Sequence, residues 1–361
     1  MKLVSTKSIV PGTILAQSIY NQRGNTLLAK GIKITKEMIK RLIQQGVTYI
    51  YIEDEFTNDV HIESSIPDKL RRKASKTIED TFLDIGRRGL NQTTPYLLEK
   101  QTKELDEFST DLISSVVSNG KSISLLADIY ISDNYIFQHS LNVAIYSTAI
   151  GMRMNMSILK LKELAIGALL HDIGKIFIDP AILNKAGSLT NDEFSIMKKH
   201  AELGYNFLRE QEYSSVIAHC AYQHHERLDG SGYPRGLTGD NIVTAAKIIG
   251  IADVFDAVTS NRVYRDAMLP HEGLELLYAG ATNLFDKEMV EVFRESIAVY
   301  PEGLTVVLND NREAVVIGQN KYVGDRPIVR IIRENEKRVN LPYEVDLSSE
   351  LNIMIKEIRK N

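Results

Sequence analysis

The chain has 361 residues, a length that favours two or three structural units over one compact domain. Hydrophobic residues make up 43% and charged residues 25%, the balance of a globular protein, and the net charge of −4 argues against binding to a nucleic acid polymer or a membrane surface. No apolar run approaches the length of a membrane span, and the N-terminus lacks the apolar core of a signal peptide. The single cysteine, Cys220, excludes a disulfide framework and a cysteine zinc site, and it favours a cytoplasmic location.

Residues 1–62 are expected to form a small α+β domain. Two short apolar runs on either side of a polar turn at 21–25 predict a hairpin, and residues 35–45 predict a helix that begins at an N-cap, Thr35. Residues 47–52 alternate as a strand would. No residue pattern in this domain indicates chemistry, so we expect it to have a regulatory or packing role.

Residues 63–119 are rich in charge and have helical periodicity, with an interruption at Arg87-Arg88-Gly89. The pattern is equally compatible with a helical connecting arm and with the first helices of the next domain. An arm of this kind could pair with a copy of itself, which would make the protein a homodimer.

Residues 120–300 contain helical patterns separated by short linkers, apart from a glycine-rich stretch at 226–241. The helices are expected at 134–152, 157–171, 190–210, 213–224, 242–261, 271–281 and 286–298. After Pro301, β-branched runs separated by turn residues predict a β-rich appendage over 301–361. The predicted fold is mainly α: a helical bundle between a small N-terminal α+β unit and a small C-terminal β-rich appendage.

Six of the eight histidines lie between His139 and His225. Candidate metal ligands recur at intervals of 24 to 32 residues, about one helix and one turn each, so antiparallel helices could bring them to one point in the bundle core. Any one of them could instead be a core histidine bonded to a backbone carbonyl, but that explanation does not account for the regular series. The series comprises His139, His171, Asp172, His200, His224, His225 and Asp253.

Five imidazoles and two carboxylates exceed the needs of one metal ion, so this series predicts two divalent ions, iron or manganese. Two such ions can bridge a hydroxide and clamp a displacement at phosphorus. His219 lies roughly 140° around its helix from His224 and is expected to take no part.

The same region contains three motifs: His171-Asp-Ile-Gly-Lys175, then His224-His-Glu-Arg-Leu-Asp-Gly-Ser-Gly-Tyr-Pro234, then Asp253-Val-Phe-Asp-Ala257 followed by Arg262-Val-Tyr-Arg265. Together they resemble the HD-GYP subfamily of the HD domain metallohydrolases. The second motif is long and specific, and the resemblance covers residues 120–300, half of the chain.

The resemblance implies an HD-type bundle in a cytoplasmic bacterial signalling enzyme, a phosphodiesterase that hydrolyses cyclic di-GMP to pGpG, to GMP or to both by attack of a metal-bridging hydroxide. It implies that the seven donors are metal ligands, that Asp172 bridges the ions, and that Asp172 and Lys175 are catalytic. It also implies that the loop around Tyr233 could contact a diguanylate cyclase domain. The residues expected to bind substrate are Lys175, Tyr233, Arg262 and Arg265.

Family members with a third metal have a glutamate one helical turn before the first histidine, where this chain has Tyr135, so we expect two ions and not three. Two alternatives stay open. The HD site could act on another cyclic dinucleotide or nucleotide, such as cyclic GMP-AMP. The chain could also be a low-turnover receptor for cyclic di-GMP that signals through a protein partner.

Overall fold

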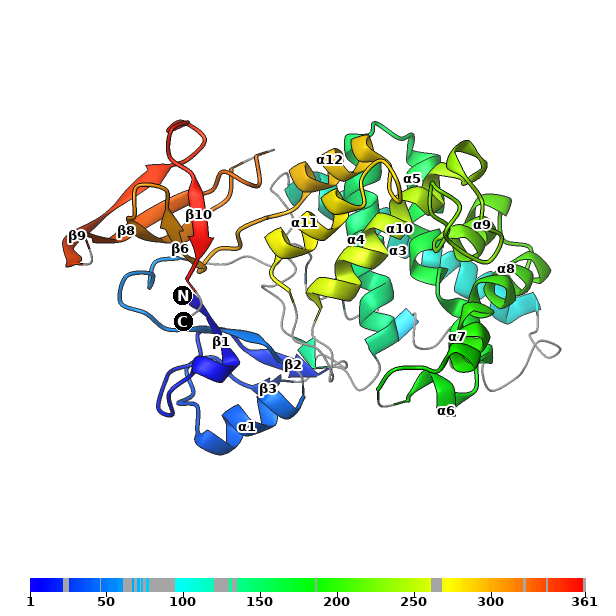
Figure 1. The fold of residues 1–361 in the computed structure, drawn as a ribbon. Helices are drawn as coiled ribbons and strands as arrows, with labels where there is room; N and C mark the ends of the chain where they lie inside the picture. The colour runs from blue at the N-terminus through cyan, green and yellow to red at the C-terminus, as the bar shows by residue number, and fades with distance from the viewer. Residues whose placement is uncertain are drawn as a thin grey trace.

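In a computed structural model of the chain, helices gather on one side of the molecule, and two small strand-containing units, one from each end of the chain, lie on the other (Figure 1). The structure describes residues 1–21, 26–45, 47–60, 95–119, 130–131, 135–185, 187–260, 268–320, 323–335 and 337–359, and a few positions between 67 and 77. Within these ranges, no helix combines the length and the apolar composition that crossing a membrane requires.

The N-terminal unit is built from two small sheets and one helix. Its elements are β1 (Lys2–Ser5), a 3-10 turn (Thr6–Ser8), β2 (Ile19–Asn21), β3 (Thr26–Leu28), α1 (Lys36–Gln44) and β4 (Tyr49–Ile52). β1 pairs antiparallel with β4, whereas β2 pairs antiparallel with β3 and parallel with β5 (Tyr130–Ile131), a strand that precedes the bundle. As predicted, Thr35 caps α1, because its hydroxyl accepts the Met38 N–H. The turn of the predicted hairpin, residues 22–25, lies outside the described residues.

The helical bundle is built around two mainly apolar helices. Its helices are α3 (Pro95–Asn119), α4 (Tyr135–Arg153), α5 (Ile158–Leu170), α6 (Pro180–Leu183), α7 (Asn191–Lys198), α8 (His200–Glu210), α9 (Ser215–Gln223), α10 (Thr244–Thr259), α11 (Pro270–Ala279) and α12 (Lys287–Ser296), with 3-10 turns at Ile173–Phe177 and Gly239–Asn241. α5 and α10 are buried along most of their length, as continuous apolar helices must be. α5 packs on α3, α4 and α9, and α10 packs on α4, α9 and α11.

One predicted helix is divided in two, which corrects the expectation of a single helix over 190–210. α7 ends at Lys198 and α8 begins at His200. The Lys199 N–H bonds to the carbonyls of Ile196 and Met197, so the chain tightens into a 3-10-like turn at the junction. Residues on both sides of the junction have helical periodicity, and for that reason the pattern did not reveal the break.

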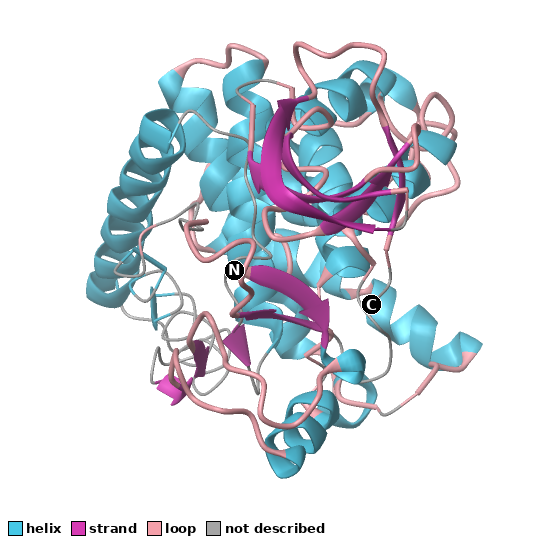
Figure 2. Ribbon diagram, turned by 90° about the vertical axis from the view of Figure 1, so that its left-hand side faces the viewer, coloured by secondary structure: helices cyan, strands magenta, loops and turns pink. Residues whose placement is uncertain are grey.

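The C-terminal unit is a five-stranded antiparallel sheet with the order β10-β6-β7-β8-β9. The strands are β6 (Thr305–Leu308), β7 (Glu313–Gly318), β8 (Ile328–Glu334), β9 (Lys337–Asp346) and β10 (Ile355–Ile358). Figure 2 shows this strongly curved sheet next to the helices. Its core is shared with the N-terminal unit: Leu3, Ala16 and Tyr51 pack in one cluster with Leu304 and Val306.

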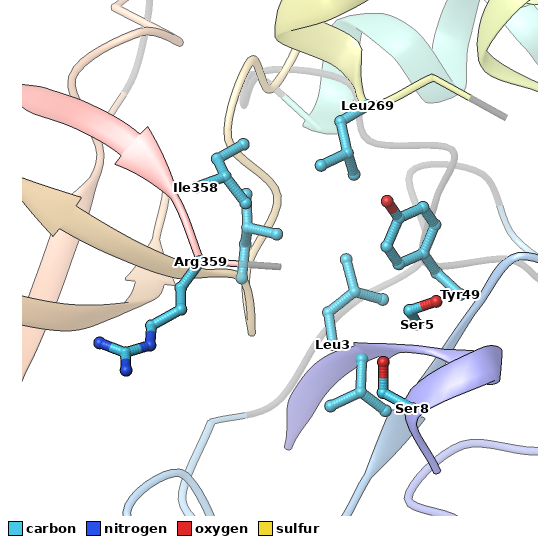
Figure 3. A pocket seen from close by; sticks show the side chains of 9 residues that line it. Leu3, Ser5, Ser8, Tyr49, Leu269, Ile358 and Arg359 are labelled. Carbon is cyan, nitrogen blue, oxygen red and sulfur yellow. The ribbon is translucent and has the colours of Figure 1, made fainter. Parts of the chain in front are cut away.

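A cavity of about 210 Å³ lies where both terminal units meet the bundle (Figure 3). Side chains from β1, β4 and β10 line it, and Leu269 at the start of α11 reaches it from the bundle. The guanidinium of Arg359 points away from it and pairs with Glu313 at 2.9 Å. The cavity is therefore a feature of the junction between the units, distinct from the histidine cluster of the bundle.

Candidate metal centre

The seven predicted donors lie in helices or directly after them. His139 is in α4, His171 and Asp172 follow α5, His200 begins α8, His224 and His225 follow α9, and Asp253 is in α10. A helix end allows adjacent residues such as His171 and Asp172 to turn toward the same point, which neighbours within a helix cannot do. The structure therefore brings all seven donors together in the bundle core, where six are buried and His225 is partly exposed.

The donors form two groups, each able to hold a metal ion. One contains Asp172, His200, His224 and His225, and the other contains His139, His171 and Asp253. Within each group the candidate ligand atoms lie within 4.8 Å of one another. Imidazole nitrogens with carboxylate oxygens are a donor set for first-row divalent metals.

Asp172 lies between the two groups. Its Oδ1 is 3.4 Å from His200 Nε2 and 3.8 Å from His224 Nε2. Its Oδ2 is 3.3 Å from His171 Nε2 and 3.8 Å from His139 Nε2. Each oxygen of one carboxylate thus faces a different donor group, which is the arrangement that a carboxylate bridging two ions needs.

Backbone carbonyls fix the orientation of three imidazoles. The Nδ1 of His171 lies 2.7 Å from the Ala168 carbonyl, and the Nδ1 of His200 lies 2.7 Å from the Met197 carbonyl. His224 Nδ1 is 3.0 Å from the carbonyl of Ala221. A carbonyl only accepts hydrogen bonds, so each Nδ1 must carry the hydrogen and each Nε2 keeps its lone pair for the centre.

Two buried atoms of the centre have no hydrogen-bond partner among the described residues: His171 Nε2 and Asp172 Oδ1. An unsatisfied buried acceptor costs free energy, so native structures usually pair it with a proton donor, water or metal ion. Both atoms face other donors of the cluster. The residues present therefore fit bound divalent metal ions.

Asp256 is a functional residue that the sequence analysis did not single out. Its Oδ2 lies 2.7 Å from His139 Nδ1, and its Oδ1 accepts a hydrogen bond from Asn142 Nδ2 at 2.8 Å. The other ring nitrogen of His139 is 3.1 Å from Asp253 Oδ1. Asp253 and Asp256 are three residues apart on one helix, and this spacing was a signal that could have predicted a second buried carboxylate on the same face.

Burial and charge set the protonation of the centre. Burial lowers the pKa of His200 to about 4, and it lowers those of His224 and His225 well below the ordinary value, so these imidazoles are neutral and able to donate lone pairs. For His139, burial by itself would lower the pKa, but hydrogen bonds to Asp253 and Asp256 have the larger combined effect. The pKa of His139 is therefore raised to about 9. The carboxylates on this side of the centre thus attract positive charge.

Lys175 supplies a positive charge beside Asp172. It lies in the 3-10 turn after α5, three residues from Asp172, and its Nζ is 2.5 Å from Asp172 Oδ2. Burial raises the pKa of Asp172, yet the charge of Lys175 and the contact with His171 outweigh burial and hold that pKa well below its ordinary value. Asp172 is therefore ionised.

This region of the chain is similar in sequence to known proteins. An HD domain model matches residues 124–289. The chain is 32% identical over 263 residues to a protein of Thermotoga maritima named cyclic di-GMP phosphodiesterase, covering 71% of this chain and 67% of that protein. The chain belongs to the HD-GYP family.

Two further similarities give the extent of the match. Over 245 residues the chain is 29% identical to the Pseudomonas aeruginosa protein named cyclic di-GMP phosphodiesterase PA4108, covering 68% of this chain but only 59% of that protein. The solved structure of Bd1817, an HDG"Y"P protein from Bdellovibrio bacteriovorus, aligns with a TM-score of 0.52 at 17% identity, over 81% of this chain and 97% of that one. At this identity the likeness shows a common fold and no more.

The C-terminal sheet also matches a known model. Residues 305–360 match a KOW domain associated with the HD domain. This range includes β6 to β10, in a region in which the sequence analysis found no motif.

The loop that carries the HD-GYP tyrosine lies against the centre. The Tyr233 ring is 4.6 Å from the His225 ring between centroids, and the Tyr233 N–H donates to the His225 carbonyl at 3.2 Å. The buried carboxylate of Glu226 holds the loop by accepting the N–H groups of Arg235 and Leu237. Burial raises the pKa of Tyr233, so the phenol stays neutral.

The structure does not describe every predicted position. Arg262 and Arg265, expected to bind substrate, lie outside the described residues, as does the side chain of Tyr135. His219 is in neither donor group, and its ring lies 5.1 Å from that of Tyr205. Cys220 is buried, and burial raises the pKa of its thiol.

Proposed function

We propose that this chain is a metal-dependent phosphodiesterase that hydrolyses cyclic di-GMP. The observation that carries the proposal is the position of Asp172, whose two oxygens face separate groups of imidazole donors. The names of the Thermotoga and Pseudomonas relatives support the same reaction and substrate. Because the chain spans 59% of the Pseudomonas protein, the activity and the substrate are inferences from this site and these names.

We further propose that the centre holds two ions, iron or manganese, one in each donor group. When bound, such ions supply Lewis acidity and lower the pKa of a water molecule, which suits displacement at phosphorus. Lys175 places its ammonium beside the Asp172 carboxylate, where it can stabilise a phosphate oxygen. Tyr233 borders the donors from the loop side and is proposed, with Arg262 and Arg265, to hold the substrate.

The test is cyclic di-GMP turnover by protein loaded with iron or manganese without oxygen, with the metal content measured and the products separated by chromatography. Asp172→Ala and His224→Ala should each reduce turnover at least about 100-fold, because they remove the bridge and one ligand. His219→Ala is the matched control: it removes a histidine of the same helix that lies outside the cluster, and it should keep wild-type turnover.

Wild-type turnover by a fully metallated Asp172→Ala protein would refute the assignment. Three ions per chain would contradict the two-ion proposal. Binding of cyclic di-GMP without formation of a product would favour the receptor alternative. Hydrolysis of cyclic GMP-AMP but not of cyclic di-GMP would show that cyclic GMP-AMP is the substrate. The same chromatogram decides between pGpG and GMP.

The remaining expectations stay predictions. These are a cytoplasmic location, self-pairing of the arm at 63–119, contact of the Tyr233 loop with a diguanylate cyclase domain, and the division of the chain at 62, 119 and 300. These predictions concern the location, the partners and the domain boundaries, and the arrangement of the donors tests none of them.

A further inference from the structure

α7 carries two side chains that extend the surface formed by Tyr233. Phe194 and Lys198 are four residues apart and so share one face of the helix. The Phe194 ring is 6.3 Å from the Tyr233 ring, and the two planes are nearly perpendicular. Lys198 Nζ lies 4.8 Å from the Phe194 centroid and 5.6 Å from the Tyr233 centroid. We call these three residues the α7 shelf.

The α7 shelf begins at the metal donors. Tyr233, its inner member, lies 4.6 Å from the His225 ring and 6.4 Å from the His200 ring. Phe194, its outer member, is 44% exposed. A ligand held at the donors can therefore meet the Tyr233 ring first and an accessible Phe194 ring beyond it.

Among the described residues, Lys198 forms no ion pair with a carboxylate of its own helix. Glu193 bonds instead to Lys185 Nζ at 2.6 Å and accepts the Thr190 N–H as part of the capping box of α7. The ion pairs of the described residues include none to Lys198. An ammonium over two aromatic rings, without a carboxylate, is suited to an incoming anion.

We propose that the α7 shelf binds one nucleotide half of the substrate, with the purine base stacked on Phe194 and its phosphate paired with Lys198. The identity of the substrate rests on the proposed function, whereas the binding of a purine nucleotide can be tested by itself. An aromatic ring stacks on any base, and an ammonium pairs with phosphate as a point charge. If the α7 shelf only packed the Tyr233 loop against α7, its residues would affect stability and not nucleotide affinity.

The experiment is calorimetric titration of the manganese-loaded protein with GMP and, separately, with inorganic phosphate. Phe194→Leu keeps an apolar side chain but removes the ring, and it should weaken GMP binding about tenfold while phosphate binding stays within about twofold. Lys198→Met keeps the aliphatic stem, and it should weaken GMP binding and make the affinity less dependent on salt. Ile196→Ala is the matched control, because Ile196 is 38% exposed on the same helix and is not part of the α7 shelf.

Equal GMP affinity in the wild type and in Phe194→Leu would overturn the proposal. An equal loss of phosphate and GMP binding in Phe194→Leu would overturn it too, as would a loss of GMP binding in Ile196→Ala equal to that in Phe194→Leu, since either result would indicate a general disturbance of the site. The proposed function can be refuted independently of the α7 shelf. If the wild type makes no product from cyclic di-GMP but binds GMP through Phe194, the proposed reaction is refuted and the proposed nucleotide-binding role of the α7 shelf is not.

Discussion

Asp256 orients His139 for the centre. Its carboxylate accepts the Nδ1 hydrogen of His139 and a hydrogen bond from Asn142, so the ring cannot turn, and Nε2 is left facing Asp253. A carboxylate in this position also makes the imidazole a stronger donor. The residue therefore acts through His139 and need not touch a metal ion or the substrate.

Asp256→Asn should reduce metal affinity about 10- to 100-fold, because the amide keeps the shape of the side chain but not its charge. Competition with a chelating dye measures the affinity. Asp286→Asn is the control, since Asp286 caps α12 by accepting the Met289 N–H and lies outside both donor groups. Equal metal affinity in wild type and Asp256→Asn would show that Asp256 only fills space.

The spacing of the seven donors in the sequence predicted that they would lie close together, because successive donors are separated by about one helix and one turn. Asp256 was missed because the three-residue spacing from Asp253 places both carboxylates on one face of the helix but does not show that this residue meets His139. Phe194 was missed for a related reason: an exposed aromatic residue at helical spacing looks like ordinary surface until Tyr233, 39 positions away, is placed beside it.

The 3-10 turn after α5 lies close against the start of α8 at Gly174. A Cβ atom at Gly174 would lie 1.9 Å from the His200 carbonyl oxygen and 2.6 Å from the Gly204 nitrogen. Only glycine allows this turn to approach the start of α8 so closely. The same contact holds His171 and Asp172 on one side and His200 on the other at a fixed separation.

Gly174→Ala should therefore separate α8 from the turn, lower the free energy of unfolding by about 1–3 kcal/mol and weaken metal binding. Thermal unfolding of the metal-free protein and metal titration measure the two effects. In Gly318→Ala, the control, the new Cβ would meet only ordinary contacts at 3.8 Å. Unchanged metal binding in Gly174→Ala would show that the helices adjust without moving the donors.

Two features of the sheets that the sequence did not predict have separate physical causes. β9 contains Pro342 and is mostly exposed because it is the edge strand of its sheet, so it lacks the apolar alternation of β6 or β8. The pairing of β2 with β5 joins segments more than 100 residues apart, and local patterns contain no information about such contacts. Helices with mainly apolar sequences, such as α5, were predicted because their own residues require burial.

At the scale of the whole molecule, the two terminal units are stabilised together. The Leu3 N–H donates to the Gly303 carbonyl at 2.8 Å, and the hydroxyl of Tyr51 donates to the Glu302 carbonyl at 3.2 Å. Arg330 in β8 pairs with Asp59 at 2.6 Å. Apolar side chains from both ends of the chain complete one cluster, so each unit depends on the other for part of its core, although the N-terminal unit also has a cluster of its own.

Tyr51→Ala should destabilise both terminal units at once, because the side chain is fully buried in their common cluster; loss of a large aromatic side chain costs about 3–5 kcal/mol. Hydrogen exchange should show reduced protection in β6 to β8 as well as in β1 and β4, while α5 and α10 keep theirs. Tyr343→Ala provides a comparison with an exposed tyrosine of the sheet. Loss confined to β1 and β4 would contradict the shared core.

The two terminal units share one core, and the helices that carry the donors lie between these units in the sequence. We call the two terminal units together the host and the helical bundle the insert. The host joins its two halves through Leu3, Tyr51 and Leu304, whereas the insert closes its own core around α5 and α10. Exchanging only one end of the chain would leave half of this shared core without its complement, and exchanging the helices would remove Leu269, which packs in the same cluster.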